Sequence, residues 1–183
     1  MAVRINGNGA VTGLTALPDS AMAEGSIVKV KQTVKTDTFS TTSQSAVDVT
    51  GLSVSITPTS TSNKILVTYD VKASCENVQM AFFLLRDSTN IYRGDQVGSN
   101  RTRTSSVIGG VADPSENNRT PAQMNAMFID SPATTSSITY KIQCQVNTGT
   151  STTDGYVNRS RSDSDDTFRT TCASSITVMQ VSA

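Results

Sequence analysis

Alternation of apolar and polar residues with a period of two is the feature that most limits the fold of this chain. It is clearest in "SITYKIQCQVN", where every second residue is apolar: Ile138, Tyr140, Ile142, Cys144 and Val146. Successive side chains of a β-strand point to opposite faces of a sheet, whereas a helix repeats every ~3.6 residues. The stretch therefore predicts a strand with one buried face and one face in water.

Similar strand patterns recur from Ile27 to the closing residues. The stretches "LSVSITP" and "KILVTYDVKAS" alternate in the same way, and we expect roughly eight to ten strands in all. Residues 80–85 form a continuous apolar run, which predicts a strand covered on both faces. The closing "SSITVMQVSA" has apolar residues on both faces, which indicates a central strand or one buried between subunits.

These patterns predict one all-β domain over residues 26–183, a two-sheet antiparallel sandwich of the jelly-roll type. Ser and Thr, which favour turns and half-buried strands, make up more than a quarter of the chain. Residues 1–25 precede the first long strand pattern and contain few large apolar side chains. We therefore expect an extended N-terminal arm over these residues.

Charge and hydropathy limit the classes of partner. Lys and Arg number 15 and Asp and Glu also number 15, so no net field draws the chain to nucleic acid. No apolar run is long enough for a membrane span, and the start lacks a secretory signal pattern. We expect no nucleic-acid binding and no membrane insertion.

The residue types that are missing exclude several kinds of catalytic site. The chain has no His, which rules out a Ser-His-Asp triad, a Cys-His pair and any His-ligated zinc. Cys75, Cys144 and Cys172 have no CxxC spacing, and we expect each to pack as a small apolar residue in a protein made in a reducing cytoplasm. We predict no cofactor, no metal and no enzymatic activity. A polysaccharide depolymerase using paired carboxylates remains a remote alternative.

Two long polar stretches, residues 94–123 and 147–171, are candidate recognition loops on a rigid sandwich. The residues we single out in or beside them are arginines and tyrosines: Tyr92, Arg101, Arg103, Arg119, Tyr156, Arg159, Arg161 and Arg169. Together they could form a polar face at one end of the sandwich that binds a glycan or a protein. The alternative is solvated loops with Arg–Asp pairs, each worth ~0–1 kcal/mol.

Three short motifs are weak evidence for a function. The cluster Asp163, Asp165 and Asp166 could attract calcium, but it lacks the Gly and closing Glu of an EF-hand loop, so a solvated turn is the favoured interpretation. The tripeptide "RGD" at residues 93–95 is interpreted as a glycine turn. The sequons at Asn118 and Asn158 indicate loop composition only.

Several stretches resemble a known family. "GSIVKVKQTVKTDTFSTTSQSAVDVTGLSVSITPTSTSNKILVTYDVKAS", "FFLLRDSTNIYRGD" and the ending "SSITVMQVSA" are similar to a β-sandwich domain of tailed-bacteriophage virion proteins from marine and freshwater hosts. The opening "INGNGAVTGLTALPDSAM" resembles the linker before that domain in tail fibres. The similarity covers residues 25–95 and 173–183, and the two long loops do not share it. The family has no catalytic motif to transfer.

The resemblance implies a virion location, assembly in the host cytoplasm and a homotrimer. We expect a tail or neck fibre, or a similar appendage that contributes to host attachment. A capsid decoration protein is the main alternative. In either case the arm is expected to dock on other virion proteins through Ile5, Val11, Leu14, Leu17 and Met22, by pairing with a sheet edge or filling a groove. A floppy terminus is the other interpretation of the arm.

Overall fold

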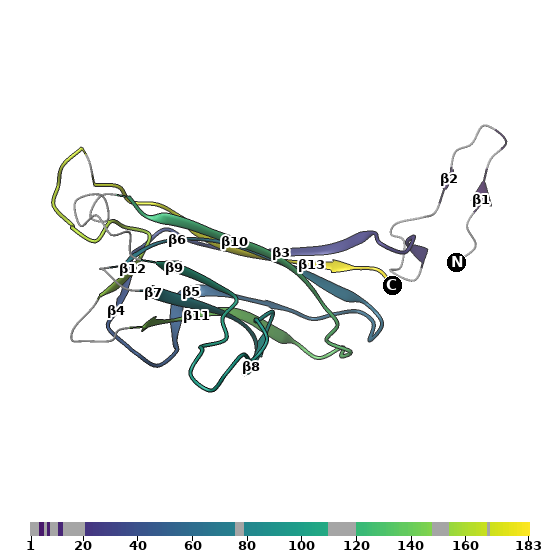
Figure 1. The fold of residues 1–183 in the computed structure, drawn as a ribbon. Helices are drawn as coiled ribbons and strands as arrows, with labels where there is room; N and C mark the ends of the chain where they lie inside the picture. The colour runs from purple at the N-terminus through teal and green to yellow at the C-terminus, as the bar shows by residue number, and fades with distance from the viewer. Residues whose placement is uncertain are drawn as a thin grey trace.

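The computed structural model is an all-β sandwich in which two antiparallel sheets pack face to face (Figure 1). It describes residues 4–5, 7, 11–12, 21–75, 79–109, 120–147, 154–167 and 169–183. This architecture confirms the fold class predicted from the alternation pattern.

Each sheet is built from strands that are far apart in the sequence. The six-stranded sheet contains β3 (Ile27–Lys35), β4 (Phe39–Thr41), β6 (Lys64–Cys75), β10 (Ala122–Asp130), β12 (Gly155–Val157) and β13 (Ser174–Val181). The five-stranded sheet contains β5 (Val47–Ile56), β7 (Gln79–Arg86), β8 (Thr89–Ile91), β9 (Ser106–Gly109) and β11 (Ile138–Asn147). A separate pair is formed by β1 (Arg4–Ile5) and β2 (Val11–Thr12).

The long strands follow a jelly-roll order. In the six-stranded sheet β10 pairs with β6, β6 with β13, and β13 with β3. In the five-stranded sheet the order is β5, β11, β7, with β8 and β9 both paired to β7. Most connections between long strands cross from one sheet to the other, as they do from β5 to β6 to β7 and from β10 to β11 to β13. This is the two-sheet arrangement of jelly rolls.

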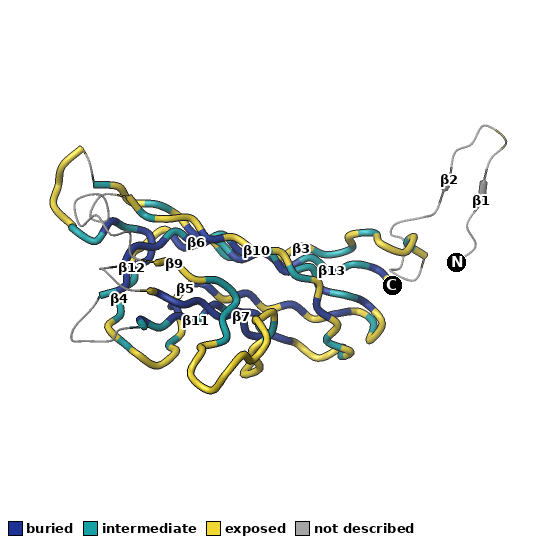
Figure 2. Tube along the Cα trace, in the orientation of Figure 1, coloured by how far each residue is buried: buried dark blue, intermediate teal, exposed yellow. Residues whose placement is uncertain are grey.

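The core lies between the two sheets, as the buried strands in Figure 2 show. Strand β11 alternates between buried and half-buried along its whole length, with Tyr140, Ile142 and Cys144 fully buried. Residues 80–85 of β7 are all buried, and Ala81, Phe83 and Leu85 form a second cluster apart from the main core. The prediction that this strand is covered on both faces is confirmed.

The last strand, β13, is a central strand. It pairs with β3 along one edge and with β6 along the other. Its inward residues Ile176 and Val178 are fully buried in the core, while Met179 is half-buried on the opposite face. The apolar residues on both faces of "SSITVMQVSA" are therefore explained by a central position in the sheet, which is the first of the two predicted explanations.

Two of the three cysteines pack as predicted. Cys75 and Cys144 are free thiols in the main core, and burial raises the pKa of Cys144 to about 12. Cys172 is also free but only half-buried, and it does not belong to the core cluster. The expectation that all three are core residues is wrong for Cys172, because it follows a surface loop and precedes β13.

A charged group fastens the two sheets together near one edge. Asp130, at the end of β10, is almost fully buried and accepts hydrogen bonds from Arg86 Nη1 on both carboxylate oxygens, at 2.9 and 2.8 Å. The Tyr140 hydroxyl donates to the same carboxylate at 2.6 Å. Burial raises the pKa of Tyr140, and the bond to Asp130 raises it further, so this hydroxyl stays protonated. Asp130 thus joins the edge strand of one sheet to β7 and β11 of the other.

Replacing Asp130 by Asn should lower the free energy of unfolding by about 2–4 kcal/mol, because it leaves Arg86 without its ion pair inside the sandwich. The estimate is below the range for a fully buried pair because the Arg86 side chain is 27% exposed. Urea denaturation of D130N and wild type measures the difference.

The matched control is Asp48→Asn, which breaks the ion pair with Lys141, where the Asp48 side chain is 50% exposed. That change should cost ~0–1 kcal/mol. Equal losses for the two variants would show that Asp130 is not a special link between the sheets.

Candidate functional site

The stretch 94–123, predicted as one long loop, is wrong in its bounds, because residues 106–109 pair with β7 as β9 and β10 begins at Ala122. The first loop is residues 92–105, which follow β8 and have a fixed base. The Ser105 amide donates to the Phe82 carbonyl at 2.9 Å, and the Ser105 hydroxyl accepts from the Leu84 amide at 2.9 Å. Within the loop, Arg103 Nε donates to the Gly94 carbonyl at 2.6 Å. Tyr92 is 41% exposed, and Arg101 is also exposed. This loop therefore presents Tyr92 and Arg101 to solvent from a rigid stem, while Arg103 holds the loop together.

The second predicted loop, residues 147–171, is also wrong in its bounds, because residues 155–157 form β12 between β4 and β6. The loop after β12, residues 158–171, is held by a fully buried amide, Asn158. Its side-chain nitrogen donates to the carbonyls of Lys35 and Asp37, at 2.8 and 3.0 Å. Its side-chain oxygen accepts from the Ser174 hydroxyl at 2.5 Å. Asn158 also has a positive φ of 66°, a conformation that Asn tolerates better than most residues. The sequon at Asn158 is thus a structural anchor whose side chain is closed to solvent.

The arginines of the second loop are largely engaged with the chain itself. Arg159 pairs with Asp163 at 3.3 Å and lies 4.0 Å above the centre of the Tyr156 ring. Arg169 pairs with Asp166 at 3.4 Å. Arg161 is half-buried, and its carbonyl accepts from Arg159 Nη1. Arg159 and Arg169 thus form Arg–Asp pairs within their own loop, as the alternative to a binding face predicts.

Tyr156 does not offer the flat exposed surface expected of it. Its ring is only 9% exposed, because β12 lies between β4 and β6 and Arg159 covers the outer side. Its hydroxyl donates to Asp154 at 2.8 Å. Tyr156 therefore supports the base of the second loop, and a partner could reach it only by displacing Arg159.

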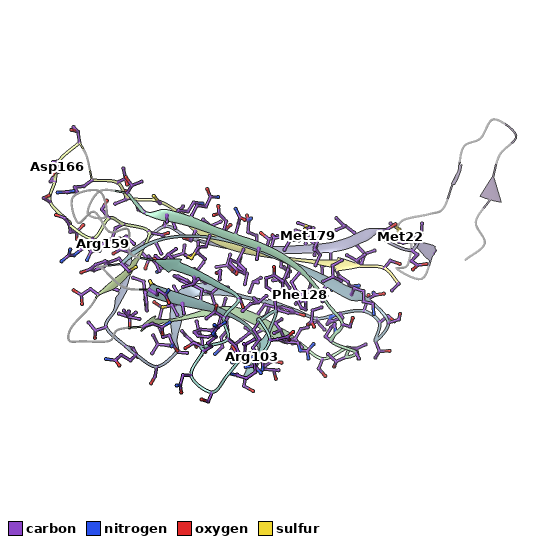
Figure 3. All side chains as sticks on the ribbon, in the orientation of Figure 1. Met22, Arg103, Phe128, Arg159, Asp166 and Met179 are labelled. Atoms are coloured by element: carbon purple, nitrogen blue, oxygen red, sulfur yellow. The ribbon has the colours of Figure 1, made fainter. Side chains whose placement is uncertain are left out.

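The two loops do not form one face. Figure 3 places Arg159 and Asp166 at one end of the sandwich, whereas Arg103 lies toward its middle on the side of the five-stranded sheet. The expected polar face at one end is therefore divided into two separate regions. Arg119 lies outside the described residues.

The acidic cluster has no geometry that suggests a cation site. Asp163 and Asp166 each face an arginine of their own loop. Among the described residues, no group of three or more His, Cys, Asp or Glu side chains is placed to hold a metal ion.

Part of the arm can also be placed. Strands β1 and β2 pair with each other, and Ile5 lies opposite Val11 in an antiparallel register. The arm is therefore not extended throughout, because it forms this short backbone pair with itself. Met22 is half-buried close to the start of β3, and Leu14 and Leu17 lie outside the described residues.

The arm joins the sandwich beside the C-terminus. The Gly25 amide donates to the Ser182 carbonyl at 2.9 Å, and the Ser182 amide donates to the Ser26 carbonyl at 2.9 Å. Both chain ends of the sandwich therefore leave it at the same place, as Figure 1 also shows.

The outer face of the six-stranded sheet carries an apolar row that crosses four strands. Directly paired residues share a face of a sheet, and the pairings place Val30, Met179, Leu66 and Ile129 side by side on β3, β13, β6 and β10. Next to this row are three more outward apolar residues: Ile27, Val181 and Met127. We call these seven residues the apolar band.

The apolar band is exposed to an unusual degree for its composition. Met127 is 67% exposed, Ile129 61%, Val30 54% and Ile27 52%. The row beside it is polar but uncharged at three of its four positions, Gln32, Thr177 and Thr68, and it ends at Met127. A contiguous apolar patch on the outside of a sheet is typical of a surface that another molecule covers.

Sequence reasoning identified only part of this band. The apolar residues on both faces of "SSITVMQVSA" predict the outward Met179 and Val181, but the sequence analysis does not single out Met127 or Ile129. The signal in "AQMNAMFID" is that apolar residues follow one another on both faces, with Phe128 inward and its two neighbours outward. The four-strand row itself depends on the register, which the sequence does not display.

No protein-family model matches the sequence, and no curated protein matches it either. The resemblance to phage virion domains therefore remains a prediction. No described helix is both long and apolar enough to span a bilayer.

Proposed function

We propose that this chain is a non-enzymatic structural protein of a bacteriophage particle. In this proposal it forms a tail or neck fibre, or a similar appendage, and contributes to attachment to the host surface. The observation that carries the proposal is the apolar band, a row of outward apolar side chains across four strands of a folded sandwich. A subunit of an assembly needs an apolar surface to bind its neighbours, whereas a domain that stays monomeric gains no stability from exposed apolar side chains.

The proposed occupant of the band is a second copy of this chain. The chain has a formal net charge of zero. The band contains no charged residue, and the charged residues beside it on β6, Lys64 and Asp70, are opposite in sign, so self-association meets no net electrostatic repulsion. The outer face of these four strands, with the band and its polar neighbours together, covers roughly 500 Å² in projection over the eight-residue length of β13, at ~4.8 Å between strands and ~3.4 Å per residue. That is the same order as the ~800 Å² per partner of a standard interface. The resemblance to fibre domains makes the proposed assembly a homotrimer.

Replacing Ile129 by Lys should dissociate the assembly, because a charge inside the covered band would lose its hydration without gaining a partner. Ile129 is 61% exposed in the single chain, so the folded subunit should tolerate the change. Sedimentation velocity should give a trimer for wild type and a monomer for I129K, with equal circular dichroism spectra.

The control is Val107→Lys, at a residue of β9 that is 48% exposed and lies on the other sheet. This variant should remain a trimer. A wild-type chain that stays monomeric at tens of micromolar, or a V107K variant that dissociates as readily as I129K, would contradict self-association through the band.

We further propose that residues 1–25 dock the sandwich on a larger particle. The arm leaves the sandwich where Gly25 and Ser26 bond to Ser182, so it starts from a fixed point at one end of the β body. Its apolar residues, Ile5, Val11, Leu14, Leu17 and Met22, are spaced among small residues and are suited to a groove or a sheet edge on another virion protein.

A chain lacking residues 1–24 should fold and form the same oligomer, because β3 to β13 are intact. It should be absent from purified particles assembled in its presence, since the contact with the particle is lost. Quantitative mass spectrometry of purified particles measures this. Incorporation at the wild-type level would refute the docking role of the arm.

Capsid decoration is the second candidate, and the fixed exit of the arm beside the C-terminus suits it equally well. In that case the sandwich is a cap and needs no ligand. The number of copies per particle separates the two: a few tens correspond to an appendage, and several hundred to decoration.

A further inference from the structure

A hollow of about 650 Å³ opens at one side of the sandwich, where an edge of each sheet meets the first loop. Its wall is formed by six residues: Tyr92, Arg93, Gly94, Thr104, Ser105 and Phe128. Phe128 belongs to β10, the edge strand of the six-stranded sheet, and Tyr92 follows β8 at the edge of the five-stranded sheet. The hollow combines aromatic surface with a guanidinium group and hydroxyl groups.

The aromatic part of the wall is held in a fixed and strained position. Tyr92 has a φ of 48°, in the left-handed region that costs a residue of this size roughly 1–2 kcal/mol. Its ring lies 5.2 Å from the ring of Phe128 at an interplanar angle of 41°. The side chain is nevertheless 41% exposed, so part of the ring faces the hollow and solvent.

The loop side of the wall is also rigid. The Gly94 amide donates to the Thr104 carbonyl at 3.3 Å, and the Gly94 carbonyl accepts from Arg103 at 2.6 Å. Ser105 is tied to β7 through its amide and its hydroxyl. A ligand would therefore meet a surface formed in advance, which lowers the entropy lost on binding.

Arg93 is the one cation of the wall, and its charge is available. It is exposed, and within the part of the chain that the structure describes its side chain has no ion pair or hydrogen bond. By contrast, Arg86, Arg159 and Arg169 each face a carboxylate. The nearest acidic residue in sequence is the exposed Asp95, which does not line the hollow.

We propose that this hollow binds an acidic sugar residue of the uronic acid type. The apolar C–H face of a pyranose ring fits against an exposed aromatic ring, and a guanidinium fork binds a carboxylate through two parallel hydrogen bonds. The hydroxyl group of Thr104 suits a hydroxyl of the sugar. The inference deepens the proposed role in host attachment and rests on it for its biological meaning, because acidic glycans are a surface that an appendage could bind.

The test is isothermal titration of the full chain with an oligosaccharide of alternating glucuronic acid and N-acetylglucosamine. A chitin oligosaccharide of equal length supplies the neutral comparison, and a poly-glutamate peptide supplies carboxylates without sugar rings. We expect binding of the acidic oligosaccharide at least about tenfold tighter than of either comparison ligand, and weaker binding at high salt.

Variants locate the site. Tyr92→Asn removes the ring but retains a residue that tolerates positive φ, and it should abolish binding. Arg93→Gln should reduce affinity for the acidic oligosaccharide about tenfold and leave the weaker affinity for the chitin oligosaccharide unchanged. Arg101→Gln, an exposed arginine of the same loop that lies outside the hollow, should bind as wild type does.

Three results would overturn the inference: no binding at millimolar ligand, equal binding of the poly-glutamate peptide, or unchanged affinity in Y92N and R93Q. None of these results bears on the trimer or on incorporation into particles, which I129K and the truncated chain test separately.

Discussion

The pairing of β13 with β3 and β6 is the constraint on which the rest of the structure depends. Through it, the last strand joins the first long strand of the chain to the longest one, and β3 belongs to the six-stranded sheet only through that connection. The inward side chains of β13 complete the core, and its outward side chains complete the apolar band. One strand thus commits one of its faces to folding and, in our proposal, the other to assembly.

The parts of the fold that depend on local periodicity could be predicted from the sequence. The alternation in β11 and the unbroken apolar run in β7 are direct consequences of one-sided and two-sided burial, and both are confirmed. The apolar band could not be predicted, because it arises from residues on four strands that only the register brings together. Met179 and Ile129 are separated by 50 positions, and both lie beside Leu66 of β6.

The candidate site was harder to predict for a related reason. Residue type suggested that six loop arginines and two tyrosines could face a partner, but type does not reveal which are already used, and it did not single out Arg93. Tyr156 and Arg159 stack on each other, and Asn158 fastens their loop to the sheet, so this region holds itself together. Tyr92 and Arg93 have the same residue types but lie in a separate region beside β8, where Tyr92 stays 41% exposed and the Arg93 guanidinium has no described partner. The two tyrosine–arginine pairs differ in their place in the fold and not in their residue types.

In the assembly that we propose, a second copy of the chain covers the outer face of the six-stranded sheet. Methionine oxidation by peroxide tests this directly, because the rate of oxidation follows exposure and the chain contains buried methionines that serve as internal references. Met127 is 67% exposed in the single chain, whereas Met80 is fully buried and Met124 is 6% exposed. We expect Met127 to be oxidised much faster than Met80 in the I129K monomer and to become nearly as protected as Met80 in the wild-type assembly. Equally fast oxidation of Met127 in the I129K variant and in wild type would mean that this face stays open to solvent, which would contradict assembly through the apolar band.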